Sequence, residues 1–280
     1  MRLTKRNILK IIKNALTEDI GRGDITTEAL IGEDKEGVGQ IIAKDCGVIA
    51  GLDVASWVYK ELDSDLKFEA LVADGERVEP GQVIAKISGF VGPILTGERV
   101  ALNFLQRMSG IATKTAKYQE QVADYDLKIV DTRKTTPGLR VLEKYAVKVG
   151  GGANHRFGLY DAVMIKDNHI QAAGSIKKAV TQIKENLSHT TKIEVEVENL
   201  TEVEEALAED VDIIMLDNMS FELMEEAVEL IAGKAIVEAS GGITIDDLVN
   251  VAETGVDIIS LGTLTHTIKS LDISLDLKGE

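Results

Sequence analysis

The segment from Asp131 to His169 concentrates positive charge in a chain whose net charge is -16. Between Thr132 and Lys166, seven Lys or Arg stand against two Asp or Glu, a local balance of 7 - 2 = +5. Arginine binds carboxylates through paired hydrogen bonds, and lysine binds phosphate as a point charge. The segment therefore predicts a site for a small molecule with several negative charges. The seven residues are Arg133, Lys134, Arg140, Lys144, Lys148, Arg156 and Lys166.

A run of charge is more often a solvated helix face than a binding site. Here, however, the positive residues fall in KIVDTRKTTPG, GGGANHR and DAVMIKDNH, which we interpret as strand ends and loops. Binding groups are usually displayed in such places. We therefore favour the binding site, in which His155 and Arg156 could reach a planar diacid together with Arg133.

Two acids end apolar strands, Glu196 in KIEVEVEN and Asp217 in DIIMLDN, and they stand 21 residues apart, about one strand-helix-strand repeat. Convergent carboxylates in an anion site favour a hard divalent cation between them and a substrate phosphate. The alternative is a pair of helix caps, since Glu194 and Glu198 share a face with Glu196. We expect Glu196 and Asp217 to bind metal or ribose.

The last two apolar strands end in glycine. Ser240, Gly241 and Gly242 follow one, and Gly262 follows the other, each before a helical stretch. Backbone amides freed by glycine at a helix start can bind phosphate. Glycine also serves as a plain turn, so only the pair of motifs predicts a phosphate site. His266, one helical turn beyond Gly262, could add a donor.

The elements that position these residues form two patterns. Residues 4 to 17 have helical apolar spacing, whereas 38 to 50 and 67 to 91 read as short strands broken by turns. A helix is predicted at 98 to 124. Six apolar strands then alternate with amphipathic helices, which predicts a parallel sheet, with barrel-like closure and a site at the carboxyl ends of the strands. The six are KIVDT, AVMIK, KIEVEV, DIIMLD, AIVEAS and DIISLG.

The domain division follows from this change of pattern. We expect a mixed α+β domain over residues 1–110 and an α/β barrel-like domain over 111–270. The segment LDISLDLK alternates like a strand, so residues 271–280 are expected to return to the first domain.

Composition limits the other classes. The chain is 44% hydrophobic and 28% charged, as globular proteins are. Its negative charge argues against nucleic acid as a partner. It has no apolar run long enough for a membrane span and no secretion signal, so we expect a cytoplasmic protein. Cys46 is the one cysteine, which excludes an internal disulfide; we expect a buried small side chain rather than a catalytic thiol.

The blocks DTRKT, GGGANHR and MIKDNHI resemble quinolinate phosphoribosyltransferase, a family also called nicotinate-nucleotide pyrophosphorylase (carboxylating). Six further blocks, in order, extend the resemblance over nearly the whole chain: EDIGRGDITT, GERVALNFLQRMSGIAT, EVEVENL, DIIMLDN, EASGGIT and SLGTLTH. Nine ordered blocks are far more specific than one short motif. The resemblance implies the fold of a type II phosphoribosyltransferase.

The resemblance also implies a reaction, in which quinolinate and 5-phosphoribosyl 1-diphosphate give nicotinate mononucleotide, diphosphate and carbon dioxide in NAD biosynthesis. It implies Mg²⁺ on Glu196 and Asp217 as the cofactor, and a homodimer or higher oligomer with shared active sites. In the family pattern Arg99 crosses the dimer interface into the partner's site, although from its sequence alone it reads as a helix-surface residue. By the same resemblance, Arg133, His155, Arg156 and Lys166 bind quinolinate, and Lys134 contacts both substrates.

Catalytic roles are expected for Lys134, Glu196 and Asp217. Two alternatives stay open at this point. One is a related phosphoribosyltransferase acting on nicotinate or another ring acid, which needs fewer cationic groups. The other is a non-catalytic barrel that binds an anionic effector and releases no diphosphate.

Overall fold

A computed structural model describes residues 3–32 and 34–278 of the chain. It divides into two compact units, and the first is built from three separate parts of the sequence, 1–116, 135–151 and 263–280. The second unit comprises residues 117–134 and 152–262. Residues 279 and 280, included in the predicted returning strand, lie outside the described residues.

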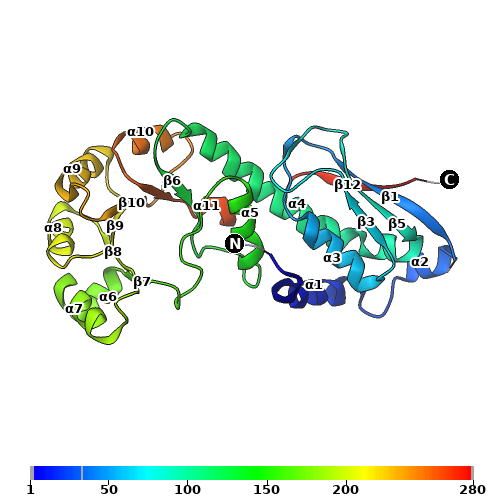
Figure 1. The fold of residues 1–280 in the computed structure, drawn as a ribbon, viewed down its shortest axis with the longest axis horizontal. Helices are drawn as coiled ribbons and strands as arrows, with labels where there is room; N and C mark the ends of the chain where they lie inside the picture. Colours follow the sequence, from blue (N-terminus) through cyan, green and yellow to red (C-terminus); the bar gives the residue numbers. More distant parts are fainter. Residues whose placement is uncertain (1–2, 33, 279–280) are drawn as a thin grey trace. The chain divides into compact units, whose positions relative to one another are not determined.

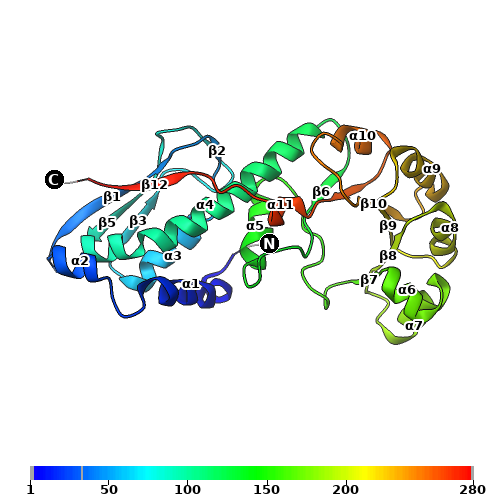
Figure 2. The ribbon, with the colours of Figure 1, turned by 180° about the vertical axis from the view of Figure 1, so that it is seen from behind.

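The first unit contains a four-stranded antiparallel sheet in the order β12-β1-β5-β3. The pairing of β12 with β1 joins segments more than two hundred residues apart, and Figure 2 shows the red and blue strands side by side. The expected return of the final strand to the first sheet is therefore observed for β12. The strands are β1 (Glu36–Ala43), β3 (Lys67–Ala70), β5 (Val83–Phe90) and β12 (Ile273–Lys278), with a small separate pair, β2 (Gly47–Val48) and β4 (Arg77–Val78).

The helices of the first unit begin with α1 (Lys5–Ile20), which buries Ile8, Ile12 and Leu16 at the four-residue spacing of one helix face. It ends at Gly21, whose positive φ of 55° suits glycine best. The others are α2 (Ile25–Leu30), α3 (Leu52–Leu62), α5 (Arg140–Val149) and α11 (Thr263–His266).

The long helix α4 spans Val91–Gln121 and so begins earlier than the predicted start at residue 98. The earlier start includes Pro93, and proline is tolerated in the first turn of a helix, where its missing N–H has no partner to lose. The proposed boundary near residue 110 falls within this helix. None of the described helices has the length and apolar composition needed to cross a membrane.

Cys46 is exposed, so the expectation that it would be buried is wrong. It lies in the turn between β1 and β2, where its N–H donates to Asp45 Oδ1 at 2.9 Å. β1 ends in buried residues, and the exposed turn begins directly after them. The hydropathy of the sequence does not show where this change occurs.

The second unit is an open six-stranded parallel sheet in the order β6-β11-β10-β9-β8-β7. All six predicted strands are present. Among the described residues no ladder joins β6 to β7, so the barrel-like curve is not closed. The strands are β6 (Lys128–Val130), β7 (Val163–Ile165), β8 (Ile193–Val197), β9 (Ile213–Asp217), β10 (Ile236–Ser240) and β11 (Ile258–Ser260).

The helices of this unit lie along the outer side of its strands in Figure 1. Three of them begin at a residue whose side chain accepts a backbone N–H three positions on: Ser175, Asn199 and Ser220. Asn199 and Ser220 begin the helices that follow β8 and β9, whereas Ser175 lies between α6 and α7. The helices are α6 (Asp167–Ala173), α7 (Ile176–Asn186), α8 (Leu200–Ala208), α9 (Phe221–Ile231) and α10 (Leu248–Glu253).

Candidate active site

The parallel register gathers acidic side chains on one face of the second unit's sheet. Glu196 on β8 pairs with Met215 on β9, and Met215 pairs with Glu238 on β10. Side chains alternate between faces along a strand, so Glu194 and Asp217 share the face of these residues. The other face of β8 carries Val195 and Val197, fully buried, as expected where a sheet packs against helices. Four carboxylates therefore lie on the face turned away from the helices.

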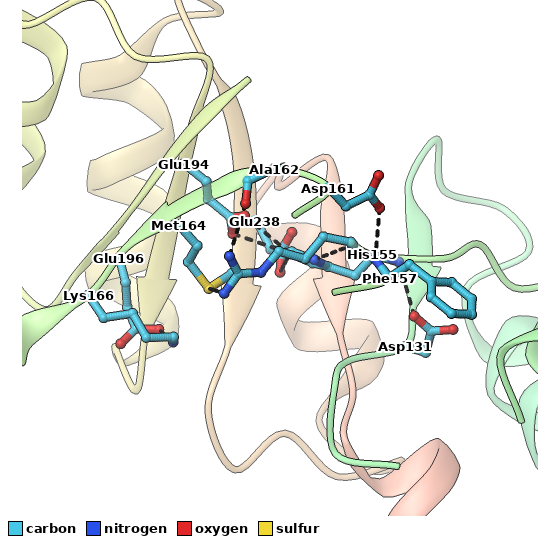
Figure 3. Close-up of polar contacts among 11 residues, drawn as sticks. Asp131, His155, Phe157, Asp161, Ala162, Met164, Lys166, Glu194, Glu196 and Glu238 are labelled. Atoms are coloured by element: carbon cyan, nitrogen blue, oxygen red, sulfur yellow. Dashed lines mark hydrogen bonds and ion pairs between the residues drawn. The ribbon is translucent and has the colours of Figure 1, made fainter. Parts of the chain in front are cut away.

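Lys166 and Glu196 form an ion pair on this face. Lys166 follows directly after β7, whose last residue, Ile165, pairs with Val195. The register thus brings Lys166 beside Glu196, and Figure 3 shows the two side chains in contact. The side chain of Glu196 is 14% exposed and so is only partly buried.

Asp217 ends β9 and lies two residues further along the sheet face than the partner of Glu196. Its Oδ2 accepts from Asn218 Nδ2 at 2.6 Å. Asn218 has a φ of 54°, a left-handed conformation that asparagine tolerates better than most residues, and its N–H donates to Ser240 O at 3.0 Å. The turn after β9 is therefore tied to the end of β10.

His155 lies between two buried carboxylates (Figure 3). Its Nε2 is 3.2 Å from Glu194 Oε2 and 3.5 Å from Glu238 Oε1, and these two residues are 2% and 1% exposed. Its backbone is fixed by buried Asp131, whose Oδ1 accepts the His155 N–H at 3.0 Å. Burial, reinforced by the charge of Glu194, raises the pKa of Glu238 to about 7.

Arg156 is held at the same face. Its Nη1 donates to Ala162 O at 3.0 Å, and its Nη2 lies 3.5 Å from Met164 Sδ. Burial, and then the nearby charge of Arg133, lower the pKa of Arg156. A guanidinium keeps its proton in any case. The positive charges of Arg133 and Arg156 repel each other. A bound dianion would offset this repulsion.

Two groups of side chains on this sheet face could hold a metal ion. Among the described residues, His155, Glu194 and Glu238 bring one donor atom each within 4.8 Å of one another. However, His155 Nδ1 accepts the Arg156 N–H at 2.6 Å, so the ring proton occupies Nε2 and leaves no lone pair there for a metal. Mg²⁺ also prefers oxygen ligands and retains several waters. The partly accessible carboxylates of Glu196 and Asp217 fit it better.

The turn after β10 provides a glycine cradle. Gly241 has a φ of 95°, and a Cβ there would lie 2.3 Å from Asn218 Oδ1, so only glycine fits. Gly242 has a φ of 62°, and a Cβ there would meet nothing within 4 Å. Space therefore opens over the amides that follow Ser240. Gly262 stands after the neighbouring strand, β11.

The remaining predicted residues fall in several places. Arg133 and Lys134 occupy the loop after β6, where the Lys134 N–H donates to Thr132 Oγ1 at 3.0 Å. Arg99 is exposed on α4 in the first unit, and His266 is exposed on α11. Three of the seven cationic residues belong instead to helix α5 of the first unit, and of these Lys144 is fully buried: Arg140, Lys144 and Lys148. The interpretation of all seven as strand-end or loop residues is therefore wrong for these three.

Sequence reasoning missed the carboxylate of Glu238 and passed over that of Glu194. Each stands in an apolar strand, in AIVEAS and KIEVEV, and an acid in a buried strand is itself a signal of a special environment. Asp131 was noted only as the start of the basic segment, although it is fully buried and anchors Asn154 as well as His155.

The chain is similar to known proteins over nearly its whole length. A family model for the quinolinate phosphoribosyl transferase C-terminal domain matches residues 111–276, and one for the N-terminal domain matches 24–109. The chain is 51% identical to a probable nicotinate-nucleotide pyrophosphorylase (carboxylating) of Synechocystis, over 94% of the chain and 90% of that protein. It is 46% identical to the probable enzyme of that name from Bacillus subtilis, over 96% and 92%. The crystal structure of NadC from Streptococcus pyogenes superposes with a TM-score of 0.96 at 46% identity, covering 99% of both chains.

Proposed function

Because the chain belongs to the quinolinate phosphoribosyltransferase family, as its sequence predicted, we propose that it makes nicotinate mononucleotide from quinolinate. The phosphoribosyl group comes from 5-phosphoribosyl 1-diphosphate, and diphosphate and carbon dioxide are released, in a step of NAD biosynthesis. The observation that carries this function is the cationic group at one sheet face. Arg133 lies close enough for its charge to lower the pKa of Arg156, after the larger effect of burial, and Lys166 stands on the same face beside Glu196.

Quinolinate is a planar ring with two adjacent carboxylates, and the cationic group matches it. We assign the two carboxylates to Arg133 and Arg156, whose forks suit bidentate binding, with Lys166 and His155 beside them. Lys134 follows Arg133 in the same loop and is assigned to both substrates. Desolvation of Arg156, which lowers its pKa, strengthens its attraction for an anion.

Catalysis in this proposal consists of positioning and charge control. The pyridine nitrogen displaces diphosphate at the anomeric carbon of the ribose. The ring nitrogen then carries positive charge and withdraws electrons, so the adjacent carboxylate can leave as carbon dioxide without an organic cofactor. Lys134 is our candidate for contacting the departing carboxylate or protonating the ring carbon that it leaves.

Glu196 and Asp217 are proposed as the residues that hold Mg²⁺ and orient the ribose. When bound, the ion would neutralise charge on the diphosphate. Lys166 pairs with Glu196 and so keeps this carboxylate turned toward the cationic group. Asn218 does the same for Asp217. The chain's own residues thus hold both carboxylates in place before any ligand arrives.

The 5-phosphate of the donor is assigned to the glycine cradle. The free space over Gly242 and the exclusion of any side chain at Gly241 support this assignment. Ser240 can donate its hydroxyl, Gly262 lies at the end of the adjacent strand, and His266 is proposed as a further donor.

Arg99 and the quaternary structure are part of the same proposal. An exposed arginine on α4 suits a role in a neighbouring subunit, so we propose a homodimer, or a higher oligomer built from it, in which Arg99 reaches the partner's quinolinate. We keep the division near residue 110 as a proposed domain boundary. A cytoplasmic location, suggested by the single cysteine, is likewise proposed.

Diphosphate release tests the function. The protein is incubated with 5-phosphoribosyl 1-diphosphate and either quinolinate or nicotinate, with and without Mg²⁺. We expect release with quinolinate that requires Mg²⁺ and is accompanied by carbon dioxide. Release with nicotinate alone would indicate the related ring-acid enzyme instead. Binding of quinolinate without release of diphosphate would indicate a non-catalytic anion-binding protein.

A further inference from the structure

Two buried carboxylates, Glu194 and Glu238, face the candidate site and have no role in the function proposed above. They lie on β8 and β10, on the sheet face that carries Lys166, Glu196 and Asp217. Buried acids are costly unless something compensates their charge, so a pair of them beside one imidazole needs a reason. The contacts of these two carboxylates give the reason for their burial.

The imidazole of His155 is the point at which these carboxylates meet the site. Its Nδ1 accepts the backbone N–H of Arg156 at 2.6 Å, so Nδ1 carries no proton. A neutral imidazole then has its proton on Nε2. That nitrogen lies 3.2 Å from Oε2 and 3.4 Å from Oε1 of Glu194, within reach of a shared hydrogen bond. Both ring nitrogens are thereby engaged by the protein.

The orientation of the His155 ring affects Arg156 through the Arg156 backbone. The N–H of Arg156 is held by the ring of His155, and the N–H of His155 is held by Asp131. The guanidinium is held separately by Ala162 O. Both ends of the Arg156 residue are therefore fixed, and the backbone end depends on the orientation of the imidazole.

We propose that Glu194 and Glu238 are positioning residues, which orient the His155 ring as its Nε2–H tautomer and through it place Arg156 to bind the substrate's carboxylate. This inference rests on the proposed function for the identity of that substrate. The arrangement resembles the way in which a carboxylate orients a histidine in metal and hydrolase sites, where the outer partner fixes tautomer and ring direction. Here the histidine passes the constraint to an arginine.

The two carboxylates do different things. Glu194 accepts the hydrogen bond from Nε2, with Oε2 at 3.2 Å and Oε1 at 3.4 Å. Glu238 Oε1 lies 3.5 Å from the same Nε2 and has no partner at hydrogen-bonding geometry within the described residues. Burial, and then the charge of Glu194, raise the pKa of Glu238 to about 7. Below about pH 7, Glu238 then lies beside Nε2 without adding a second negative charge.

The spectroscopic test requires no substrate. The whole protein is labelled with ¹⁵N-histidine, and the signals of His155 are assigned among those of the four histidines by their loss in His155→Gln. We expect an unprotonated Nδ1 and a protonated Nε2 from about pH 6 to 8, the range in which a free imidazole changes charge. An imidazolium at neutral pH, or a proton on Nδ1, would overturn the proposal whether or not the protein turns over quinolinate.

The kinetic test uses a conservative and a disruptive variant at Glu194. Glu194→Gln keeps an acceptor for Nε2–H, whereas Glu194→Met does not. We expect Glu194→Met to raise the KM for quinolinate roughly tenfold with kcat and the KM for the phosphoribosyl donor little changed, and Glu194→Gln to restore most of the loss.

The control is Glu226→Met, an exposed position on the outer helix α9. Equal loss in Glu194→Met and Glu194→Gln, or a fall in kcat alone, would contradict positioning through a hydrogen bond. If Glu194→Met does not fold, the histidine spectra of Glu194→Gln and of the unchanged protein decide the question. Absence of turnover in the unchanged protein, with the expected tautomer present, would refute the proposed function and leave the positioning intact.

Discussion

Arg107 and Glu143 form a buried ion pair between α4 and α5 in the first unit. Nε and Nη2 of Arg107 donate to the same Oε1 of Glu143 at 2.9 and 2.6 Å, and Glu143 is 1% exposed. Thr136 joins the pair, since its N–H donates to Glu143 Oε2 at 3.1 Å and its Oγ1 accepts from Arg107 at 2.6 Å. The loop that follows Lys134 is thus anchored by a charged network.

Removing one partner of this pair should be costly. Arg107→Met leaves the buried carboxylate of Glu143 without its cation, and we expect a loss of about 3 to 5 kcal/mol in the free energy of unfolding. The double variant Arg107→Met/Glu143→Met should lose much less, because no charge is then buried alone. Urea unfolding followed by circular dichroism checks this, with exposed Arg6→Met as the control. A single variant as mild as the double would show that the pair carries little energy.

The arginines assigned to quinolinate allow the planar shape of the guanidinium to be tested separately from its positive charge. Arg133→Lys and Arg156→Lys keep the charge but lose the planar fork, and each lost charge-assisted hydrogen bond costs about 1.5 to 3 kcal/mol. We expect quinolinate affinity to fall roughly tenfold or more, with donor affinity little changed. Calorimetric titration of each ligand measures both, and Arg6→Lys is the matched control. Equal weakening of both ligands would assign these arginines to general electrostatics.

The glycine cradle gives a prediction with an internal control for backbone strain. Gly242→Val places a side chain in the open space assigned to the 5-phosphate, and it strains a φ of 62°. Gly233→Val strains a φ of 74° at the end of α9, also with no atom within 4 Å of the new Cβ. Both should lose similar stability.

Only Gly242→Val should weaken binding of the donor and of nicotinate mononucleotide, while quinolinate binding changes little. Equilibrium binding of the three ligands to both variants decides the matter. If Gly242→Val and Gly233→Val bind the donor with equal affinity, the 5-phosphate does not bind at Gly242.

Arg99 links the chemistry to assembly. Arg99→Ala should fold and dimerise but be nearly inactive, because the partner's quinolinate loses a desolvated cation. Mixing it with an inactive Lys134→Ala protein should restore turnover, since each mixed dimer has one site with both residues intact. With random exchange about half the dimers are mixed, so up to about a quarter of the original activity per subunit returns. Exchange confirmed by native mass spectrometry without recovered turnover would remove Arg99 from the site.

The pH dependence of stability should report Glu238. Its pKa is about 7 in the folded protein against an ordinary value of 4.5, so between these values the folded state holds a proton that the unfolded state releases. Stability from this group is therefore complete below 4.5 and is lost as the pH rises to about 7. Relative to Glu238→Gln, the unchanged protein should lose stability across this window and remain constant above it. A stability difference that is flat with pH would place the proton elsewhere.

Much of the second unit could be predicted from sequence because its strands are short, apolar and regularly spaced, and each is followed by a helix. The sites at strand ends follow from this repeat, as Glu196 and Asp217 illustrate. The pattern does not show which acids share a face across strands, because this depends on the register of three strands. Glu238 therefore became visible as a neighbour of His155 only in the structure.

The first unit was harder to predict for a different reason. Helix α5 follows the loop of Arg133 and Lys134 directly in sequence but belongs with α4, to which Glu143 is paired through Arg107. Local periodicity identifies a helix but not the body against which its buried face packs. The burial of Lys144 could not be predicted for the same reason. A lysine in an amphipathic helix is expected to be solvated unless the packing partner of that helix is known.

The pairing of β12 with β1 has a consequence for synthesis on the ribosome. The edge strand of the first sheet is translated after every residue of the second unit, so β1 must wait with one side unpaired while the parallel sheet emerges. An unpaired strand edge is a template for association with other chains. The second unit can fold as soon as β11 leaves the exit tunnel, whereas the first sheet closes only after β12 has also left it. Nascent chains stalled before residue 273 should therefore be the species that most requires a chaperone.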